Sequence, residues 1–158
     1  MSLTRCEFGP VMCDVDIEAT RSAYAQNPAK PIGGCECRDC LNFAAQHAQL
    51  LRGAFFDWLA QTGIDPLKPH EVTCGGDEGE PRLYWVNYGV AGRIIPGPGA
   101  EWHKTMGLHT PNSIQAYGTE YTLWDRDPLI QRKLFPGEAF GIEVYIRDVP
   151  WVLGETDT

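Results

Sequence analysis

The stretch of sequence that decides the predicted fold reads Gly33-Gly34-Cys35-Glu36-Cys37-Arg38-Asp39-Cys40-Leu41-Asn42-Phe43. It places three cysteines close together and runs directly into the longest helical pattern of the chain. A segment rich in proline and glycine, residues 27–34, precedes it and predicts a loop. The cysteines are therefore expected on a turn and on the first turn of a helix.

The helical pattern predicts one long helix from Cys40 to Thr62, with Asp39 as its N-cap. Gly63 and the pair Asp65-Pro66 provide a helix end. Such a helix would be roughly 33 Å long and would span the domain. Gly53 inside it marks either a bend or a close packing contact. The apolar residues that recur at intervals of three and four are Leu41, Ala44, Ala45, Ala48, Leu51, Phe55, Trp58 and Leu59.

The rest of the chain shows mainly strand patterns. Apolar residues alternate from Val11 to Ala19, which predicts a strand; a helix from Glu18 to Gln26 capped by Asp16 is the competing interpretation. The remaining predicted strands lie at 70–74, 83–88 with an extension over 90–95, 113–124 as a strand or a hairpin broken at Gly118, and 140–147. Residues 96–112 are expected to be irregular. The sequence thus predicts a single α+β domain over residues 1–158, with one long helix packed on a mostly antiparallel sheet.

Composition limits the classes of partner and location. The 158 residues carry a net charge of -8, and their lysines and arginines form no stripe, which argues against binding to nucleic acid or to an anionic membrane. A basic protein partner or a cation suits this charge, although the charge also serves solubility alone. The chain has no apolar run of the length that crosses a membrane, and Glu7, Pro10 and Asp14 interrupt any signal-peptide core. A cytoplasmic protein is therefore expected.

The cysteine spacing predicts a metal site. Cys35, Cys37 and Cys40 supply three of the four ligands of a tetrahedral structural zinc ion. Cys74, before a pair of glycines, is the preferred fourth ligand. The other candidates are Cys13, Cys6, His70 and His47.

Two other interpretations of the same cysteines stay open. In the first, the thiols are free and only pack against their neighbours or cap the helix. In the second, Cys37 and Cys40 form a redox dithiol, because an adjacent arginine and a helix start lower a thiol pKa. The proline-rich loop ahead of them differs from the strand that precedes such a motif in thioredoxin-like proteins.

A second candidate site lies in the segment 99–111. It holds His103 and His109, together with a glutamate, a lysine and a tryptophan. Long irregular loops often bind ligands, so both histidines are candidate ligand-binding residues. A solvated surface loop is the simpler interpretation, because no nucleophile motif or phosphate-binding loop accompanies them.

Several of these segments together resemble a family of small uncharacterised bacterial proteins. The likeness rests on the cluster Cys35 to Phe43, the helix end at 62–66, the strand 83–88 running into 92–94, and the terminal Val149-Pro150-Trp151-Val152-Leu153. It implies a shared α+β domain in a bacterial cytoplasm and brings no activity with it.

The leading functional hypothesis from sequence is a non-catalytic binding domain that engages a basic partner, for example as an immunity or antitoxin-like protein. In this hypothesis the cysteine cluster is structural and holds zinc. The rival hypothesis is a small enzyme that combines a thiol or metal site at Cys37 and Cys40 with the loop of His103 and His109.

Overall fold

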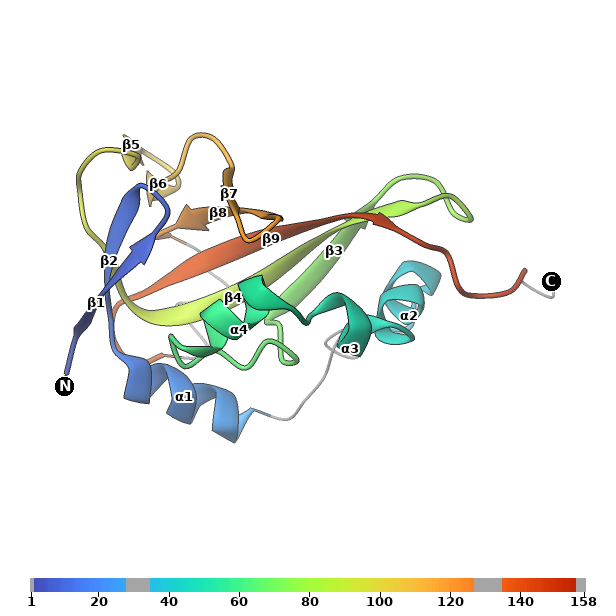
Figure 1. Ribbon diagram of the computed structural model, residues 1–158, viewed down its shortest axis with the longest axis horizontal. Coiled ribbons are helices and arrows are strands. Elements are labelled where there is room, and N and C mark those ends of the chain that lie inside the picture. Colours follow the sequence, from blue (N-terminus) through green and yellow to red (C-terminus); the bar gives the residue numbers. More distant parts are fainter. Residues whose placement is uncertain (1, 28–34, 127–134, 156–158) are drawn as a thin grey trace.

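The computed structural model describes residues 2–27, 35–126 and 135–155 and shows a mainly β protein (Figure 1). Strands make up 40% and helices 20% of the structure. The helices, in chain order, are α1 (Ile17–Gln26), α2 (Arg38–Ala44), α3 (His47–Leu50) and α4 (Ala54–Ala60). The strands are β1 (Thr4–Phe8), β2 (Val11–Val15), β3 (Glu71–Gly75), β4 (Arg82–Ile94), β5 (Glu101–His103), β6 (Gly107–His109), β7 (Ile114–Ala116), β8 (Thr119–Trp124) and β9 (Ala139–Val149).

The strands form one antiparallel sheet in the order β1-β2-β4-β9-β8-β6-β5, with β3 paired to β4 and β7 paired to β8. The long strands β4 and β9 pair along most of their length and form its centre. The sheet curls into a half barrel, and the helices lie along its concave side (Figure 1). Strand alternation sends Tyr84, Val86, Tyr88 and Val90 of β4 to the buried side, where all four are fully or almost fully buried.

The expected long helix is wrong, and with it the predicted α+β architecture. Residues 40–62 contain three short helices instead of one. The helical path is interrupted at Gln46 (φ -134°), at Leu51 and at Gly53, which has φ of 111°. Only glycine adopts that last conformation without strain. A straight helix could not follow a curled sheet, whereas short helices at changing angles bury Phe43, Phe55 and Leu59 on it.

Sequence and structure agree better at the strands. Both interpretations of residues 11–26 hold in part: β2 ends at Val15, and Asp16 then caps α1 by accepting a hydrogen bond from the Ala19 N–H at 3.0 Å. The β3–β4 hairpin and the β7–β8 hairpin around Gly118 are present. The segment 96–112, expected to be irregular, contains the β5–β6 hairpin. The expected loop at 28–34 lies outside the described residues.

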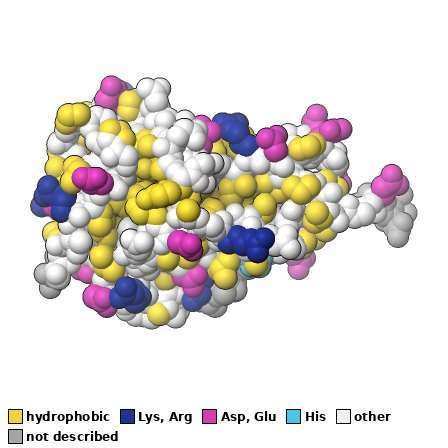
Figure 2. All heavy atoms as spheres, in the orientation of Figure 1, with side chains coloured by type: hydrophobic (Ala, Val, Ile, Leu, Met, Phe, Trp, Pro, Cys, Tyr) yellow, Lys and Arg dark blue, Asp and Glu magenta, His cyan; other side chains and the backbone are white. Residues whose placement is uncertain are grey.

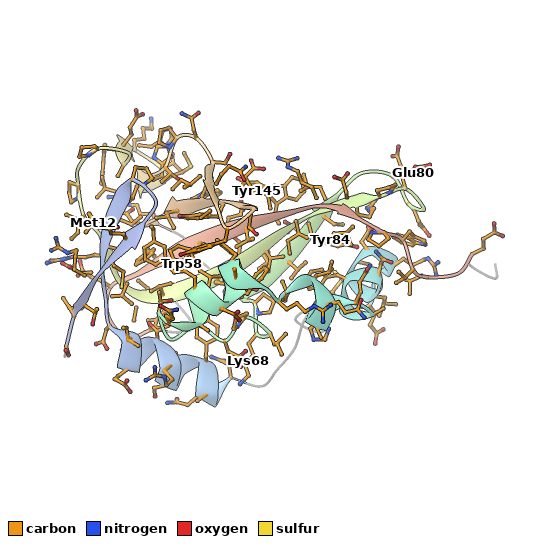
Figure 3. The ribbon with its side chains drawn as sticks, viewed as in Figure 1. Met12, Trp58, Lys68, Glu80, Tyr84 and Tyr145 are labelled. Atoms are coloured by element: carbon orange, nitrogen blue, oxygen red, sulfur yellow. The ribbon has the colours of Figure 1, made fainter. Side chains whose placement is uncertain are left out.

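The main core lies between the sheet and α4. Trp58 on α4, labelled in Figure 3, is half-buried. Its ring contacts Phe8 of β1, with ring centroids 5.0 Å apart, and Tyr121 of β8 at 5.8 Å. Phe55 on the same helix adds a contact to Tyr121 at 5.4 Å. These rings join β1 and β8, which do not pair in the sheet, through the helix between them.

Within the described residues, no helix has the length and apolar character needed to cross a membrane.

Candidate metal centre

The sulfur atoms of Cys35, Cys37 and Cys40 form one group, which we call the thiol cluster. All three Sγ atoms lie within 4.8 Å of one another. Cys35 and Cys37 are exposed and Cys40 is half-buried, so the cluster lies at the surface. Four thiolates around zinc, each bonded at about 2.3 Å, stand about 3.8 Å apart, so small side-chain rotations would bring these three sulfurs onto a soft metal ion.

The local backbone explains why the three thiols meet. Cys37 is the N-cap of α2, with extended backbone, and its carbonyl accepts a hydrogen bond from the Leu41 N–H at 2.9 Å. Cys40 lies on the first turn of the helix, and Cys35, two residues before Cys37, has its sulfur within 4.8 Å of the other two. The expected cap, Asp39, instead lies inside the helix.

Mutual contact shifts the thiol pKa values in opposite directions. The pKa of Cys35 is lowered, because its sulfur accepts hydrogen bonds from the Cys37 backbone N–H and from the thiols of Cys37 and Cys40. The pKa of Cys40 is raised, first by burial and then by its two neighbours. Cys35 therefore forms a thiolate more readily than Cys40, whereas a bound divalent cation would stabilise all of its cysteine ligands as thiolates.

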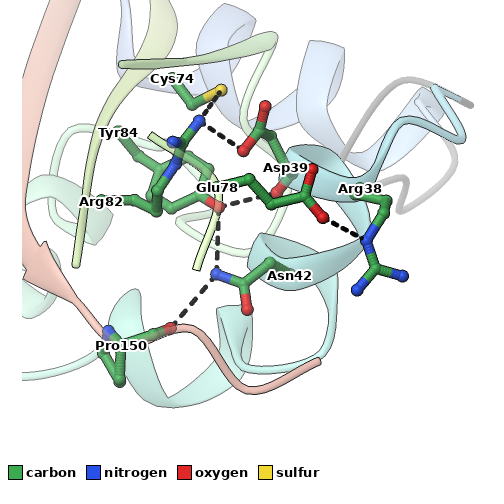
Figure 4. Close-up of polar contacts among 8 residues, drawn as sticks. All are labelled: Arg38, Asp39, Asn42, Cys74, Glu78, Arg82, Tyr84 and Pro150. Atoms are coloured by element: carbon green, nitrogen blue, oxygen red, sulfur yellow. Dashed lines mark hydrogen bonds and ion pairs between the residues drawn. The ribbon is translucent and has the colours of Figure 1, made fainter. Parts of the chain in front are cut away.

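Beneath the cluster, a buried polar network attaches α2 to the sheet (Figure 4). The Tyr84 hydroxyl donates to the Asp39 carbonyl at 2.7 Å and accepts from the Asn42 amide at 3.2 Å. Arg82, whose side chain is only 4% exposed, forms an ion pair with the Asp39 carboxylate at 2.5 Å. Asp39 and Asn42, on either side of Cys40 in α2, are thus bonded to side chains of β4.

The same network holds the C-terminal segment. The Asn42 amide donates to the Pro150 carbonyl at 3.2 Å and its oxygen accepts from the Val152 N–H at 2.8 Å. The Trp151 ring lies beside two guanidinium groups, that of Arg38 at 5.6 Å and that of Arg82 at 6.0 Å. Arg38 also pairs with Glu78 in the β3–β4 turn at 2.8 Å. Three segments, namely β4, the β3–β4 turn and the C-terminal segment, therefore meet around α2.

Cys74, the preferred fourth ligand, does not belong to the thiol cluster. It lies on β3 opposite Tyr84, and its sulfur is 3.7 Å from the Arg82 guanidinium (Figure 4). The pKa of the Cys74 thiol is raised, and burial of the thiol is the largest cause. None of the other candidates, Cys13, Cys6, His70 and His47, joins the cluster within the described part of the chain.

The two histidines of the second candidate site come together, but far from the cysteines. His103 and His109 lie on the β5–β6 hairpin with their rings 5.8 Å apart. His109 Nδ1–H donates to the Glu101 carbonyl at 2.9 Å, and His103 Nδ1 accepts from the Thr105 N–H at 3.2 Å. This hairpin and α2 lie at opposite ends of the sheet (Figure 1). A single site combining thiols and histidines, which the enzyme hypothesis required, is not formed.

Sequence reasoning missed the supporting residues. Asn42 is completely buried and Arg82 nearly so, yet each occurs in a pattern that fits ordinary helix or strand surface. One signal was available for Asn42, a polar residue next to Phe43 at the start of an apolar pattern. Nothing in the local sequence around Arg82 distinguishes a buried arginine from a surface one.

Comparison of the chain with protein-family models, with curated proteins and with solved structures gives no match. The site is therefore interpreted from its own geometry.

Proposed function

We propose that this chain is a non-catalytic binding domain whose thiol cluster holds one zinc ion. The proposal of a metal rests on the mutual distances of the three sulfur atoms, which all lie within 4.8 Å of one another. Thiolate ligands select soft or borderline cations, and among common cellular metals zinc is the usual occupant of cysteine-rich structural sites.

The proposed ion has a structural role. The network around Asn42, Tyr84 and Arg82 holds α2 from the sheet side, and the ion would hold the chain before α2 from the solvent side. It would bridge Cys35 and Cys37, which precede the helix, to Cys40 within it. The fourth ligand in this proposal is a water molecule or a group from a partner, because the cluster faces solvent.

The partner that we propose is a basic protein. The net charge of -8 supports this choice, because opposite charge accelerates encounter and selects among partners. An immunity or antitoxin-like role in a bacterial cytoplasm is a specific form of the proposal. All six cysteines are free thiols, which suits a reducing compartment.

The metal proposal is tested by metal content and by cobalt spectroscopy. Protein purified without chelator should contain about one zinc ion per chain. Cobalt(II) in its place should show the absorption of thiolate-bound tetrahedral cobalt. Cys40→Ser should lose most of the metal affinity, whereas Cys74→Ser, the matched control outside the cluster, should keep it. Metal-free protein with three reactive surface thiols, or equal affinity in the two variants, would refute the proposal.

A further inference from the structure

A groove lies on the concave side of the protein, between the edge of β1 and the β7–β8 hairpin, which do not pair with each other. Its volume is about 740 Å³, within the range of ligand sites. β1 forms one wall, the turn between β7 and β8 forms the opposite wall, and Trp58 and Gln61 of the α4 region also line it. Figure 2 shows hydrophobic side chains gathered over this middle part of the face.

Within the described residues, the edge of β1 that faces away from β2 carries backbone groups with no hydrogen-bond partner. The Ile95 N–H donates to the Met12 carbonyl at 2.8 Å, so the backbone groups of Met12 face β4 and those of its neighbour Cys13 face β1. Cys6 is opposite Cys13, and its backbone groups therefore face β2. It follows that the N–H and C=O groups of Arg5 and Glu7 point away from the sheet. Among the described strands, only β2 pairs with β1.

The opposite wall carries an aromatic side chain in a strained position. Tyr117 and Gly118 form the two-residue turn between β7 and β8, with φ of 50° and 77°. Such a turn favours asparagine or glycine at its first position, and a tyrosine there costs conformational energy. The Tyr117 side chain is nevertheless 64% exposed and lies 6.0 Å from the Trp58 ring, at the rim of the groove.

The floor and the charge of the groove restrict what would fit it. Tyr121 is fully buried, lies beside Gly9, and its hydroxyl has no hydrogen-bond partner within the described residues. Among the residues described as lining the groove, Glu7 is the only charged one. An occupant with apolar side chains and positive charge is complementary to this lining.

We infer that the groove binds an extended, basic segment of a partner protein, which adds a strand to the free edge of β1. The backbone of the segment would pair with Arg5 and Glu7, as in other cases of strand addition. An apolar side chain of the segment would lie between Trp58 and Tyr117, and a lysine or arginine would pair with Glu7. This inference rests on the proposed role as a binding domain and does not depend on the metal.

The test uses two libraries of nine-residue peptides with blocked ends and an apolar residue at the centre. Lysine and arginine flank the centre in one library, and aspartate and glutamate in the other. Binding of labelled peptides to the full chain is followed by fluorescence polarisation. The basic library should yield binders that protect the Arg5 and Glu7 amides from hydrogen exchange, and the acidic library should yield none. Absence of binders in the basic library would overturn the inference.

Single-residue variants test whether the peptide binds in the groove. Tyr117→Asn should raise the melting temperature, because asparagine suits the turn, yet weaken peptide binding at least tenfold. Trp102→Asn is the matched control, since Trp102 is similarly exposed, at 62%, on another hairpin and does not line the groove; it should leave binding unchanged. Glu7→Pro removes the outward N–H at this position of β1 together with the carboxylate that would pair with the basic side chain, and it should abolish binding.

Three further outcomes would overturn the inference. The first is equal peptide affinity in the wild type and Tyr117→Asn, a result that remains readable even if Glu7→Pro fails to fold. The second is protection from exchange at amides outside the groove. The third is a dimer of the chain that Tyr117→Asn dissociates, because a second copy would then occupy the groove. Metal content measured on the same samples separates these results from failure of the zinc proposal.

Discussion

The side-chain oxygen of Asn42 accepts a hydrogen bond from the backbone N–H of Val152 at 2.8 Å, although 110 residues separate the two. The amide of the same side chain donates to the Pro150 carbonyl. The Asn42 side chain thus offers the C-terminal segment one donor and one acceptor, as the backbone of a paired strand does. The contact joins the cysteine-rich entry to α2 with the C-terminal segment.

Replacement of Asn42 by alanine should destabilise the protein strongly. The change leaves the Val152 N–H without its acceptor and removes one of the two donors to the Pro150 carbonyl, which should lower the free energy of unfolding by about 2–3 kcal/mol. Urea denaturation followed by tryptophan fluorescence measures this loss. Gln46→Ala is the control, because Gln46 also donates to the Pro150 carbonyl, at 2.8 Å, but at a solvent-exposed position. It should cost less than about 1 kcal/mol, and equal losses in both variants would contradict the role assigned to Asn42.

Strands could be predicted from this sequence better than helices, for a physical reason. Alternation along β2 and β9 directly reflects which side of the sheet each residue faces. The apolar spacing from Leu41 to Leu59 reflects burial too, but it persists across the breaks at Gln46 and Gly53. A chain of short helices that all bury one side produces nearly the same spacing as one long helix, so the sequence pattern does not separate them.

The candidate site was predictable only in its local part. Cys35, Cys37 and Cys40 come together because they are neighbours in sequence. Cys74 was placed with them by residue type alone, and the pairing of β3 with β4 instead brings it to Arg82. Contacts such as Asn42 with Pro150 depend on the path of the whole chain and leave no local signal.

Loss of Asp39 and loss of Arg82 should destabilise the protein by different amounts, although the two side chains form one ion pair. The Arg82 side chain is 4% exposed and that of Asp39 is 30% exposed. Asp39→Asn leaves a buried cation without its counter-charge, whereas Arg82→Met leaves a carboxylate that water can reach. We expect Asp39→Asn to lower the free energy of unfolding by about 3–4 kcal/mol and Arg82→Met by about half as much.

Urea denaturation of the two single variants and of the double variant gives the coupling energy between the side chains. The double variant should be less destabilised than the sum of the single changes. Additive losses would show that the two charges do not interact.

Asp14 should make the stability of the protein depend on pH in the acid range. Its carboxylate lies 2.5 Å from Arg5 and 3.3 Å from Arg93, and the hydrogen bond from Arg5 is the first cause that lowers its pKa. A carboxyl group with a lowered pKa stabilises the fold above its unfolded pKa of about 3.9, and this stabilisation is lost as the pH falls through the folded value. The free energy of unfolding should therefore fall with decreasing pH in this range.

Asp14→Asn should flatten this part of the profile, as measured by urea denaturation between pH 2 and pH 6. Glu18→Gln removes a negative charge from an exposed pair with Arg21 and serves as the control. A profile that keeps its full slope in Asp14→Asn would assign the acid sensitivity to other groups.

Two glycines should separate the cost of backbone conformation from the cost of crowding. Gly53 has φ of 111° with no atom within 4 Å of the position of an added Cβ, whereas Gly63 has φ of 91° and its Cβ would lie 2.5 Å from the Ile17 carbonyl oxygen. Gly53→Ala should therefore lower the free energy of unfolding by about 1–3 kcal/mol, through strain alone. Gly63→Ala should cost more, because α1 must also move away. Thermal and urea denaturation of both variants measure the difference. Equal losses of stability in the two variants would mean that α1 moves aside at no cost. No loss of stability in Gly53→Ala would show that the backbone before α4 can adopt a conformation that alanine also allows.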